Sequence, residues 1–197
     1  MKEIEIKLAI DDADEARRRL GEAGAVALAA RSFEDNRLYD DAARSLKSSG
    51  RLLRIRAVGG RNVLTFKAKP DGPAGDARYK IRDEYETEIA DAAELDRVLR
   101  ALGFEPAYRY QKYRQPYRLG GVEVLLDETR LGGVEVLLDE TPVGNFLELE
   151  GPPEAIDAAA RTLGFAPADY DTRTYRELHQ ARTGREEPGD MVFPETA

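Results

Sequence analysis

Acidic residues of this sequence recur at alternate positions in two strand-like segments. Glu3 and Glu5 alternate with isoleucines near the N-terminus, and Glu148 and Glu150 alternate with leucine in the segment NFLELEG. Successive side chains of a β-strand point to opposite faces, so the two glutamates of each pair share one face. Carboxylates are the oxygen ligands that Mg²⁺ and Mn²⁺ prefer in proteins. The two pairs are therefore candidate metal ligands.

Basic residues are paired in the same way in the segments that lie between. Arg54 and Arg56 share a face of LLRIRAV, and Lys112 and Arg114 share a face of QKYR. Guanidinium groups bind phosphate oxygens with parallel hydrogen bonds, so these pairs are candidate ligands for a polyanion. An ordinary antiparallel sheet with one wet, charged face shows the same alternation. An enclosed site is favoured over that alternative because the charged face is almost purely Arg/Lys and Glu/Asp, and because acidic and basic pairs occupy different segments.

Several classes of function are disfavoured by composition. The 197 residues include no cysteine and one histidine, His179, which argues against thiolate metal sites, a Cys nucleophile, a Ser-His-Asp triad and a multi-histidine zinc site. The net charge of −8 argues against bulk attraction to nucleic acid or to an anionic membrane. The N-terminus is too polar for a signal peptide, and no apolar run reaches membrane-spanning length. We therefore expect a cytoplasmic protein that binds neither nucleic acid nor membrane.

The elements that must position these residues are mostly strands. Hydrophobic alternation predicts strands at 3–8, 33–39, 52–58, 62–69, 78–89, 109–118 and 145–151, with a hairpin turn at GGR (59–61). Helices are predicted at 12–23, 91–102 and 152–163, and a short helix or strand at 170–182. A polar loop is expected up to Gly50. We expect a single domain over residues 1–182, followed by a loosely held tail over residues 183–197.

The ordered charged blocks resemble a known family. EIEIK, from Glu3 to Lys7, is similar to the ExExK signature of the CYTH superfamily, the triphosphate tunnel metalloenzymes. Further blocks follow in the family's order: LRIR, LTFKAK, RDEYETE, QKYR, LLDETPVGNFLELEG and TRTYREL. The resemblance implies an α+β fold in which an eight-stranded antiparallel β-barrel forms a tunnel with a charged lumen and helices packed outside.

The resemblance also implies roles for the charged residues. The expected ligands of Mg²⁺ or Mn²⁺ are Glu3, Glu5, Asp139, Glu148 and Glu150. The expected substrate-binding residues are Arg54, Arg56, Lys67, Lys69, Arg82, Lys112, Arg114 and Arg173. The expected catalytic residues are Glu84, Glu86 and Lys7, with Glu84 or Glu86 activating a water molecule. For Lys69, Glu84, Glu88 and Arg173, a purely structural role is the alternative.

Phosphoryl transfer needs positioning and charge neutralisation more than it needs histidine or cysteine. The expected function is metal-dependent hydrolysis of inorganic triphosphate or a small organic triphosphate, because the sequence shows no clear adenine pocket. A class IV adenylyl cyclase, which converts ATP to cyclic AMP and pyrophosphate, is the alternative. A non-catalytic module that binds polyphosphate or nucleotide is a second alternative.

The twelve residues RLGGVEVLLDET occur twice in succession, at 118–129 and at 130–141. Two copies are too few for a solenoid, and one additional strand would reverse the direction of every later strand. We expect one copy in the barrel and the other extruded as a loop, at a cost on the order of 1 kcal/mol. The second copy, with Asp139 in place of Asp127, keeps the short connection to Glu148 and is favoured for the barrel. An extruded VEVLL edge would favour pairing with another chain, so a homodimer is a further expectation.

Overall fold

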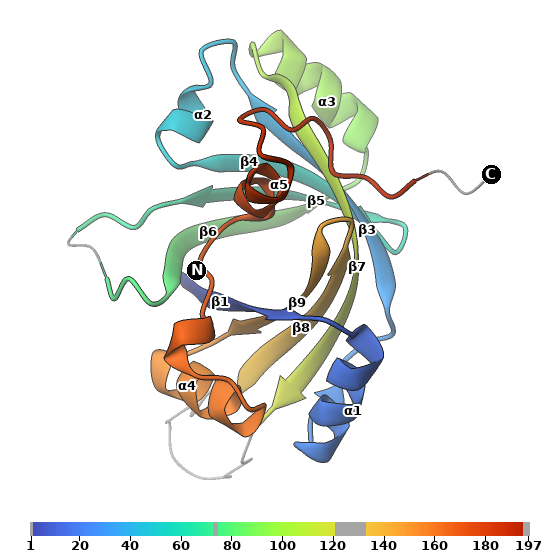
Figure 1. Ribbon diagram of the computed structural model, residues 1–197. Coiled ribbons are helices and arrows are strands. Elements are labelled where there is room, and N and C mark those ends of the chain that lie inside the picture. The colour runs from blue at the N-terminus through green and yellow to red at the C-terminus, as the bar shows by residue number, and fades with distance from the viewer. Residues whose placement is uncertain (1, 73–74, 121–132, 195–197) are drawn as a thin grey trace, which may run out of the picture.

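Eight antiparallel strands close into a barrel in the computed structural model, which describes residues 2–72, 75–120 and 133–194 (Figure 1). The strands follow the order β7–β3–β4–β5–β6–β1–β9–β8, and β8 pairs with β7 to close the ring. They are β1 (Lys2–Ile10), β3 (Ser32–Asp40), β4 (Leu52–Val58), β5 (Arg61–Ala68), β6 (Lys80–Ile89), β7 (Glu105–Leu119), β8 (Val134–Thr141) and β9 (Gly144–Glu150). A ninth strand, β2 (Val26–Ala27), pairs with β7 outside the ring. The predicted fold class is confirmed.

The described residues form five α-helices around this barrel. They are α1 (Ala13–Glu22), α2 (Ser45–Ser48), α3 (Ala92–Ala101), α4 (Pro153–Thr162) and α5 (Tyr175–Thr183). The side chains of Asp12 and Asp91 accept backbone N–H groups of the first turns of α1 and α3, which explains where these two helices begin. No helix in the described part of the chain has both the length and the apolar composition to cross a membrane.

The short helix α2 lies where a polar loop was expected. Its start is held by Asp40, whose carboxylate accepts the backbone N–H groups of Leu46 and Lys47. Asp40 ends β3, so this contact ties α2 to the end of that strand. Leu46 and Lys47 lie six and seven positions after Asp40, so the hydrophobic pattern of the loop does not predict these hydrogen bonds.

The main hydrophobic core lies on the outer face of the barrel. Ile6 and Leu8 of β1 and Leu138 of β8 pack with Leu20 of α1 and Ile156 of α4. Figure 1 shows α1 and α4 on this side of the barrel and α3 near the opposite end. Each fully buried aliphatic side chain contributes about 1.5–3 kcal/mol to stability. Because the helices cover the apolar face, the alternate positions of the same strands are directed into the barrel.

The segment after α5 runs along β7. Met191 is buried and forms a parallel β-bridge with Tyr110. Its backbone N–H donates to the carbonyl of Arg109, and its carbonyl accepts the backbone N–H of Gln111. The ring of Phe193 lies 5.3 Å from that of Tyr113. This segment therefore makes specific contacts where the composition indicated a loosely held tail.

The second copy of the duplicated sequence forms β8. Val134 pairs with Leu119 of β7, and Thr141 pairs with Gly144 across the turn into β9, so both ends of β8 are fixed. Arg118 and Leu119 of the first copy end β7. Residues 121–132 lie outside the described residues, and so does the expected extrusion of one copy.

A chain with a single copy should fold like the full-length protein. Removing residues 118–129 or residues 130–141 gives the same sequence, in which one copy follows Tyr117 directly and supplies the end of β7 and all of β8. We expect thermal melting followed by circular dichroism to give a Tm within about 4 °C of the original, since the loop accounts for about 1 kcal/mol.

The control is a chain without residues 118–141, which lacks β8 and should not fold. Unfolding of the single-copy chain would contradict the assignment of one copy to the barrel.

Candidate active site

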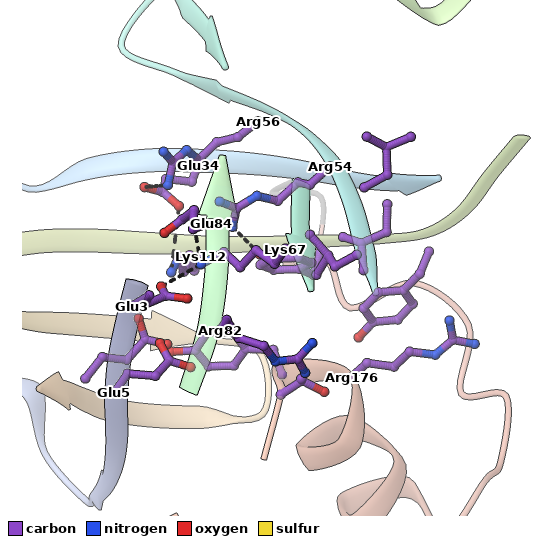
Figure 2. Close-up of a pocket in the computed structure, with 18 of the residues that line it drawn as sticks. Glu3, Glu5, Glu34, Arg54, Arg56, Lys67, Arg82, Glu84, Lys112 and Arg176 are labelled. Atoms are coloured by element: carbon purple, nitrogen blue, oxygen red, sulfur yellow. Dashed lines mark hydrogen bonds and ion pairs between the residues drawn. The ribbon is translucent and has the colours of Figure 1, made fainter. Parts of the chain in front are cut away.

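The inward face of the barrel encloses a cavity of about 660 Å³ (Figure 2). All eight barrel strands contribute to its lining, through residues such as Glu5, Lys67 and Lys112. Ser32 and Asp40, the first and last residues of β3, both line it, so the cavity extends along the whole strand. The charged face predicted from alternation is therefore the wall of a tunnel.

Three carboxylates gather on one side of this cavity. Oxygen atoms of Glu3, Glu5 and Glu150 lie within 4.8 Å of one another, because β1 pairs with β9 and places Glu5 opposite Glu150. Burial, together with the charges of Glu148, Glu5 and Glu3, raises the pKa of Glu150 to about 8 against the opposing effect of Arg114. One carboxylate oxygen of Glu3, Oε2, is buried without a hydrogen-bond partner. Crowded carboxylates with an unpartnered oxygen fit a divalent cation such as Mg²⁺ or Mn²⁺.

Lysines surround the carboxylate group. Lys67 Nζ lies 2.6 Å from Glu3 and 3.0 Å from Glu84. Lys7 Nζ lies 3.0 Å from both Glu5 and Glu148. Burial lowers the pKa of Lys7, but the two carboxylates outweigh burial and raise it above its usual range. Lys7 therefore stays protonated and serves as a buried positive charge.

Asp139 and Glu148, two other expected metal ligands, are bound to basic residues. Asp139 is fully buried and accepts hydrogen bonds from Lys112 at 2.8 Å, from Arg114 at 2.6 and 2.7 Å, and from the Tyr175 hydroxyl at 2.6 Å. Glu148 accepts from Arg114 and pairs with Lys7. Neither carboxylate belongs to the group formed by Glu3, Glu5 and Glu150. Their ion pairs fix the positions of Lys7, Lys112 and Arg114.

The expected phosphate-binding arginines lie across the cavity on β4. Arg54 donates to Tyr110 at 3.0 Å and to Thr65 at 3.1 Å, and both Arg54 and Arg56 lie 3.3 Å from Glu86. Arg56 remains partly exposed to the cavity. These guanidinium groups are held in place by neutral and acidic partners while still facing the lumen.

Glu34 of β3 lies among these basic residues. Its carboxylate is 3.7 Å from Lys112 and 3.9 Å from Arg56. Burial opposes its ionisation, but Lys112, Arg114 and Arg56 outweigh burial and lower the pKa of Glu34 to about 2. Glu34 is thus a buried anion that neutralises part of the basic wall.

Most predicted site residues line the cavity, and three do not. Lys69 is exposed beyond the end of β5, and Arg173 is exposed and paired with Asp171 at 2.6 Å. Asp139 lies beneath the lining residues. The other thirteen are in the wall: Lys7, Glu84, Glu86, Arg54, Arg56, Lys67, Arg82, Lys112, Arg114, Glu3, Glu5, Glu148 and Glu150. Arg82 also donates to the carbonyl oxygen of Gly50.

The wall also contains residues that the sequence prediction left out, among them Glu34, Lys80, Tyr175 and Arg176. Glu34 and Lys80 occupy alternate positions of predicted strands, so the same pattern could have identified them. Lys80 pairs with Glu5. Tyr175 and Arg176 belong to α5, and no strand pattern reports on them.

Comparison with known proteins agrees with this architecture. The family model described as the CYTH domain matches residues 1–175. A candidate adenylate cyclase from Vibrio parahaemolyticus is 20% identical, with a TM-score of 0.70 over 89% of this chain and 96% of that one. A conserved hypothetical protein from Pyrococcus furiosus is 28% identical, with a TM-score of 0.66 over 89% and 99% of the two chains. A search of curated proteins finds no match.

A third solved structure carries functional information about its own protein. It is a candidate adenylyl cyclase from Hippeastrum, described as having a dominant triphosphatase activity. It is 22% identical to this chain, with a TM-score of 0.56 over 94% of this chain and 98% of that one.

The two identical copies provide a matched pair of substitutions. Asp139→Asn should destabilise the protein by about 3–5 kcal/mol, because buried Lys112 and Arg114 lose their counter-charge. The expected fall in Tm is about 6–20 °C. Asp127→Asn changes the same residue in the same twelve-residue context, and we expect it to leave Tm unchanged. Equal effects of the two substitutions would show that either copy can occupy the barrel.

Metal binding can be measured without an activity assay. Mg²⁺ or Mn²⁺ added to the chelator-treated protein should raise its stability by about 2.7 kcal/mol at a concentration of 100 Kd, seen as a higher Tm. Glu150→Gln removes one of the three clustered carboxylates, so we expect this shift to disappear. Glu88→Gln, an exposed residue of β6 outside the cavity lining, is the control and should retain it. A full metal-induced shift in Glu150→Gln would place the ion elsewhere.

Proposed function

Since this chain belongs to the CYTH family, whose members are triphosphatases or adenylyl cyclases, we propose that it is a metal-dependent triphosphatase. The observation that carries the proposal is the arrangement of charge in the cavity. A group of three carboxylates, of which Glu5 is buried and the other two are half-buried, faces a wall of basic residues across one enclosed space. Such an arrangement suits a substrate that is both a polyanion and a metal ligand.

Glu3, Glu5 and Glu150 are the residues that would hold the ion. A bound Mg²⁺ or Mn²⁺ would neutralise phosphate oxygens and polarise their bonds to phosphorus. Asp139 and Glu148 would contribute to catalysis indirectly. Their ion pairs hold in place the basic side chains of Lys7, Lys112 and Arg114. The proposed metal site is therefore smaller than the five carboxylates that the family resemblance implied.

Arg54, Arg56, Lys112 and Arg114 are the proposed ligands of the phosphate chain. Their present partners include Glu34 and Glu86, which are the anions that an entering phosphate would replace. Exchange of one anion for another keeps the buried cations paired throughout binding. The basic wall also stabilises negative charge on the departing phosphate.

Hydrolysis requires a water molecule that attacks the terminal phosphorus. The bond between that phosphorus and its bridging oxygen breaks, orthophosphate forms, and the electron pair remains on the departing diphosphate. Glu84 is the proposed acceptor of the proton from water, because it lines the cavity beside Lys67 and that lysine also binds Glu3. Lys7 would act through its charge, since its ammonium group stays protonated.

An assay with inorganic triphosphate, thiamine triphosphate and ATP tests this proposal. We expect orthophosphate to be released in the presence of Mg²⁺ or Mn²⁺ and not after chelation. Glu5→Gln should lower kcat by at least about 100-fold, because it removes a direct metal ligand. Arg56→Ala should raise KM about 10-fold through the loss of a charge-assisted hydrogen bond to phosphate.

Arg173→Ala is the control for Arg56→Ala, because Arg173 is an exposed arginine outside the cavity. It should leave KM unchanged. Formation of cyclic AMP and pyrophosphate from ATP would identify a cyclase instead. Metal-dependent binding of triphosphates without turnover would identify a non-catalytic module.

A further inference from the structure

Tyr175, the first residue of α5, joins the C-terminal segment to the charged network of the tunnel. Its side chain is buried and lines the cavity. Its hydroxyl donates to Oδ2 of Asp139 at 2.6 Å. The ammonium groups of Lys7 and Lys112 lie 5.2 and 5.1 Å from the centre of its ring. One neutral side chain therefore contacts two buried lysines and the carboxylate that binds one of them.

The backbone before α5 sets the position of Tyr175. The backbone N–H of Lys7 donates to the carbonyl of Asp171 at 2.8 Å, and the N–H of Asp171 donates to the carbonyl of Lys7 at 2.9 Å. Figure 1 shows the segment crossing β1 on its way from α4 to α5. Thr174 and Glu177 then form a capping box that fixes the start of α5. The chain thus places Tyr175 beside the residue whose charge its ring contacts.

Aromatic neighbours fix the orientation of the Tyr175 ring. The centres of the Phe146 and Tyr110 rings lie 5.7 and 5.9 Å from it. Burial, together with the charges of Asp139 and Glu148, raises the pKa of Tyr175 above its usual range. The hydroxyl therefore stays protonated and remains a neutral donor to Asp139.

Three donors meet at one carboxylate oxygen. Oδ2 of Asp139 accepts hydrogen bonds from Lys112 at 2.8 Å and from Arg114 at 2.6 Å, in addition to the Tyr175 hydroxyl. A neutral donor stabilises part of the negative charge, so the carboxylate attracts the two cations less strongly. Lys112 and Arg114 are proposed phosphate ligands. They can turn toward a phosphate more easily when the hydroxyl continues to satisfy Asp139.

The ring has a comparable effect on the lysines. An ammonium group within about 6 Å of an aromatic ring centre is attracted to the ring face, and the attraction is stronger away from water. The side chains of Lys7 and Lys112 are each only 2% exposed. The ring stabilises these charges without introducing a further anion that would repel a phosphate.

We propose that Tyr175 is a positioning residue of the phosphate-binding wall, whose hydroxyl satisfies Asp139 and whose ring stabilises the two lysines without adding negative charge. This inference rests on the proposed triphosphatase function. Tyr175 also belongs to a hydrophobic cluster with Tyr108, Tyr110 and Phe146. A side chain that served only this cluster would affect stability and leave the affinity for phosphate unchanged.

Two tyrosine-to-phenylalanine substitutions separate these roles. Tyr175→Phe removes the hydroxyl and keeps the ring. Tyr170→Phe is the matched control, because the Tyr170 hydroxyl also donates to an aspartate, Asp157 at 2.9 Å, but lies outside the cavity lining. The measured quantity is the Kd of inorganic triphosphate, obtained by calorimetry with a chelator present so that no metal-dependent turnover occurs. We expect Tyr175→Phe to raise Kd about 5-fold and Tyr170→Phe to leave it within about 2-fold of the original.

The kinetic assay with metal gives a second readout. KM should rise by a similar factor in Tyr175→Phe while kcat stays within about 2-fold, because the hydroxyl acts on phosphate ligands and not on the proposed metal ligands. Tyr175→Leu also removes the ring and should raise Kd further. The stoichiometry of each titration counts the folded molecules, so partial unfolding lowers the stoichiometry and leaves Kd interpretable. An unchanged Kd and KM in Tyr175→Phe, or equal increases in Tyr170→Phe, would overturn the inference.

A double substitution tests whether Tyr175 acts through the basic residues. Tyr175→Phe should change Kd by a smaller factor in a chain that carries Lys112→Gln, because one of the cations that compete for Asp139 is then absent. Equal factors in the two backgrounds would contradict this route. A wild-type protein that binds triphosphate without hydrolysing it would refute the proposed function, and the comparison of Kd values would still decide the role of Tyr175.

Discussion

Charged side chains inside a closed barrel are removed from water, so each of them must find a counter-charge within the barrel. Lys7 forms ion pairs with both Glu5 and Glu148. Asp139 likewise forms ion pairs with both Lys112 and Arg114. Loss of one partner from such a pair costs about 3–5 kcal/mol, because the remaining charge stays buried and uncompensated. The barrel is stable because its outer face buries the apolar core while its inner face keeps this pairing nearly complete.

Pairing is incomplete at the place that we propose for the metal ion. Lys7 and Lys80 pair with Glu5, and Lys67 pairs with Glu3. The pKa of the neighbouring Glu150 is raised, first by burial and then by the carboxylates around it. On the opposite wall, Glu34 and Glu86 form ion pairs with basic residues that we propose as phosphate ligands. A bound metal ion would neutralise the carboxylate group, and a bound phosphate would neutralise the basic residues. The two binding events would be coupled because both groups belong to one network of ion pairs.

The same network explains the position of the second VEVLLDET segment, which forms β8. β8 lies between β7 and β9, and its Asp139 is the shared acceptor of Lys112, Arg114 and Tyr175. A second strand inserted there would separate β7 from β8 and break these contacts. The pairing of β7 with β8 closes the ring of hydrogen-bonded strands at this position.

Local alternation was sufficient to predict which side chains face inward, since a strand repeats every two residues and Glu3, Glu5, Arg54 and Arg56 needed no information from elsewhere in the chain. It could not predict which carboxylates group together, because that depends on the register between strands far apart in sequence. Register placed Glu150 beside Glu5 and directed Asp139 toward Lys112 and Arg114.

Tertiary structure alone also brought Tyr175 and Arg176 of α5 into the tunnel wall and left Lys69 and Arg173 outside it. The sequence by itself therefore determined a barrel with a charged interior, because the pattern of side chains along each strand is a local property. Only the closed barrel decided which charges meet, because contacts between distant strands and helices are set by how the whole ring packs.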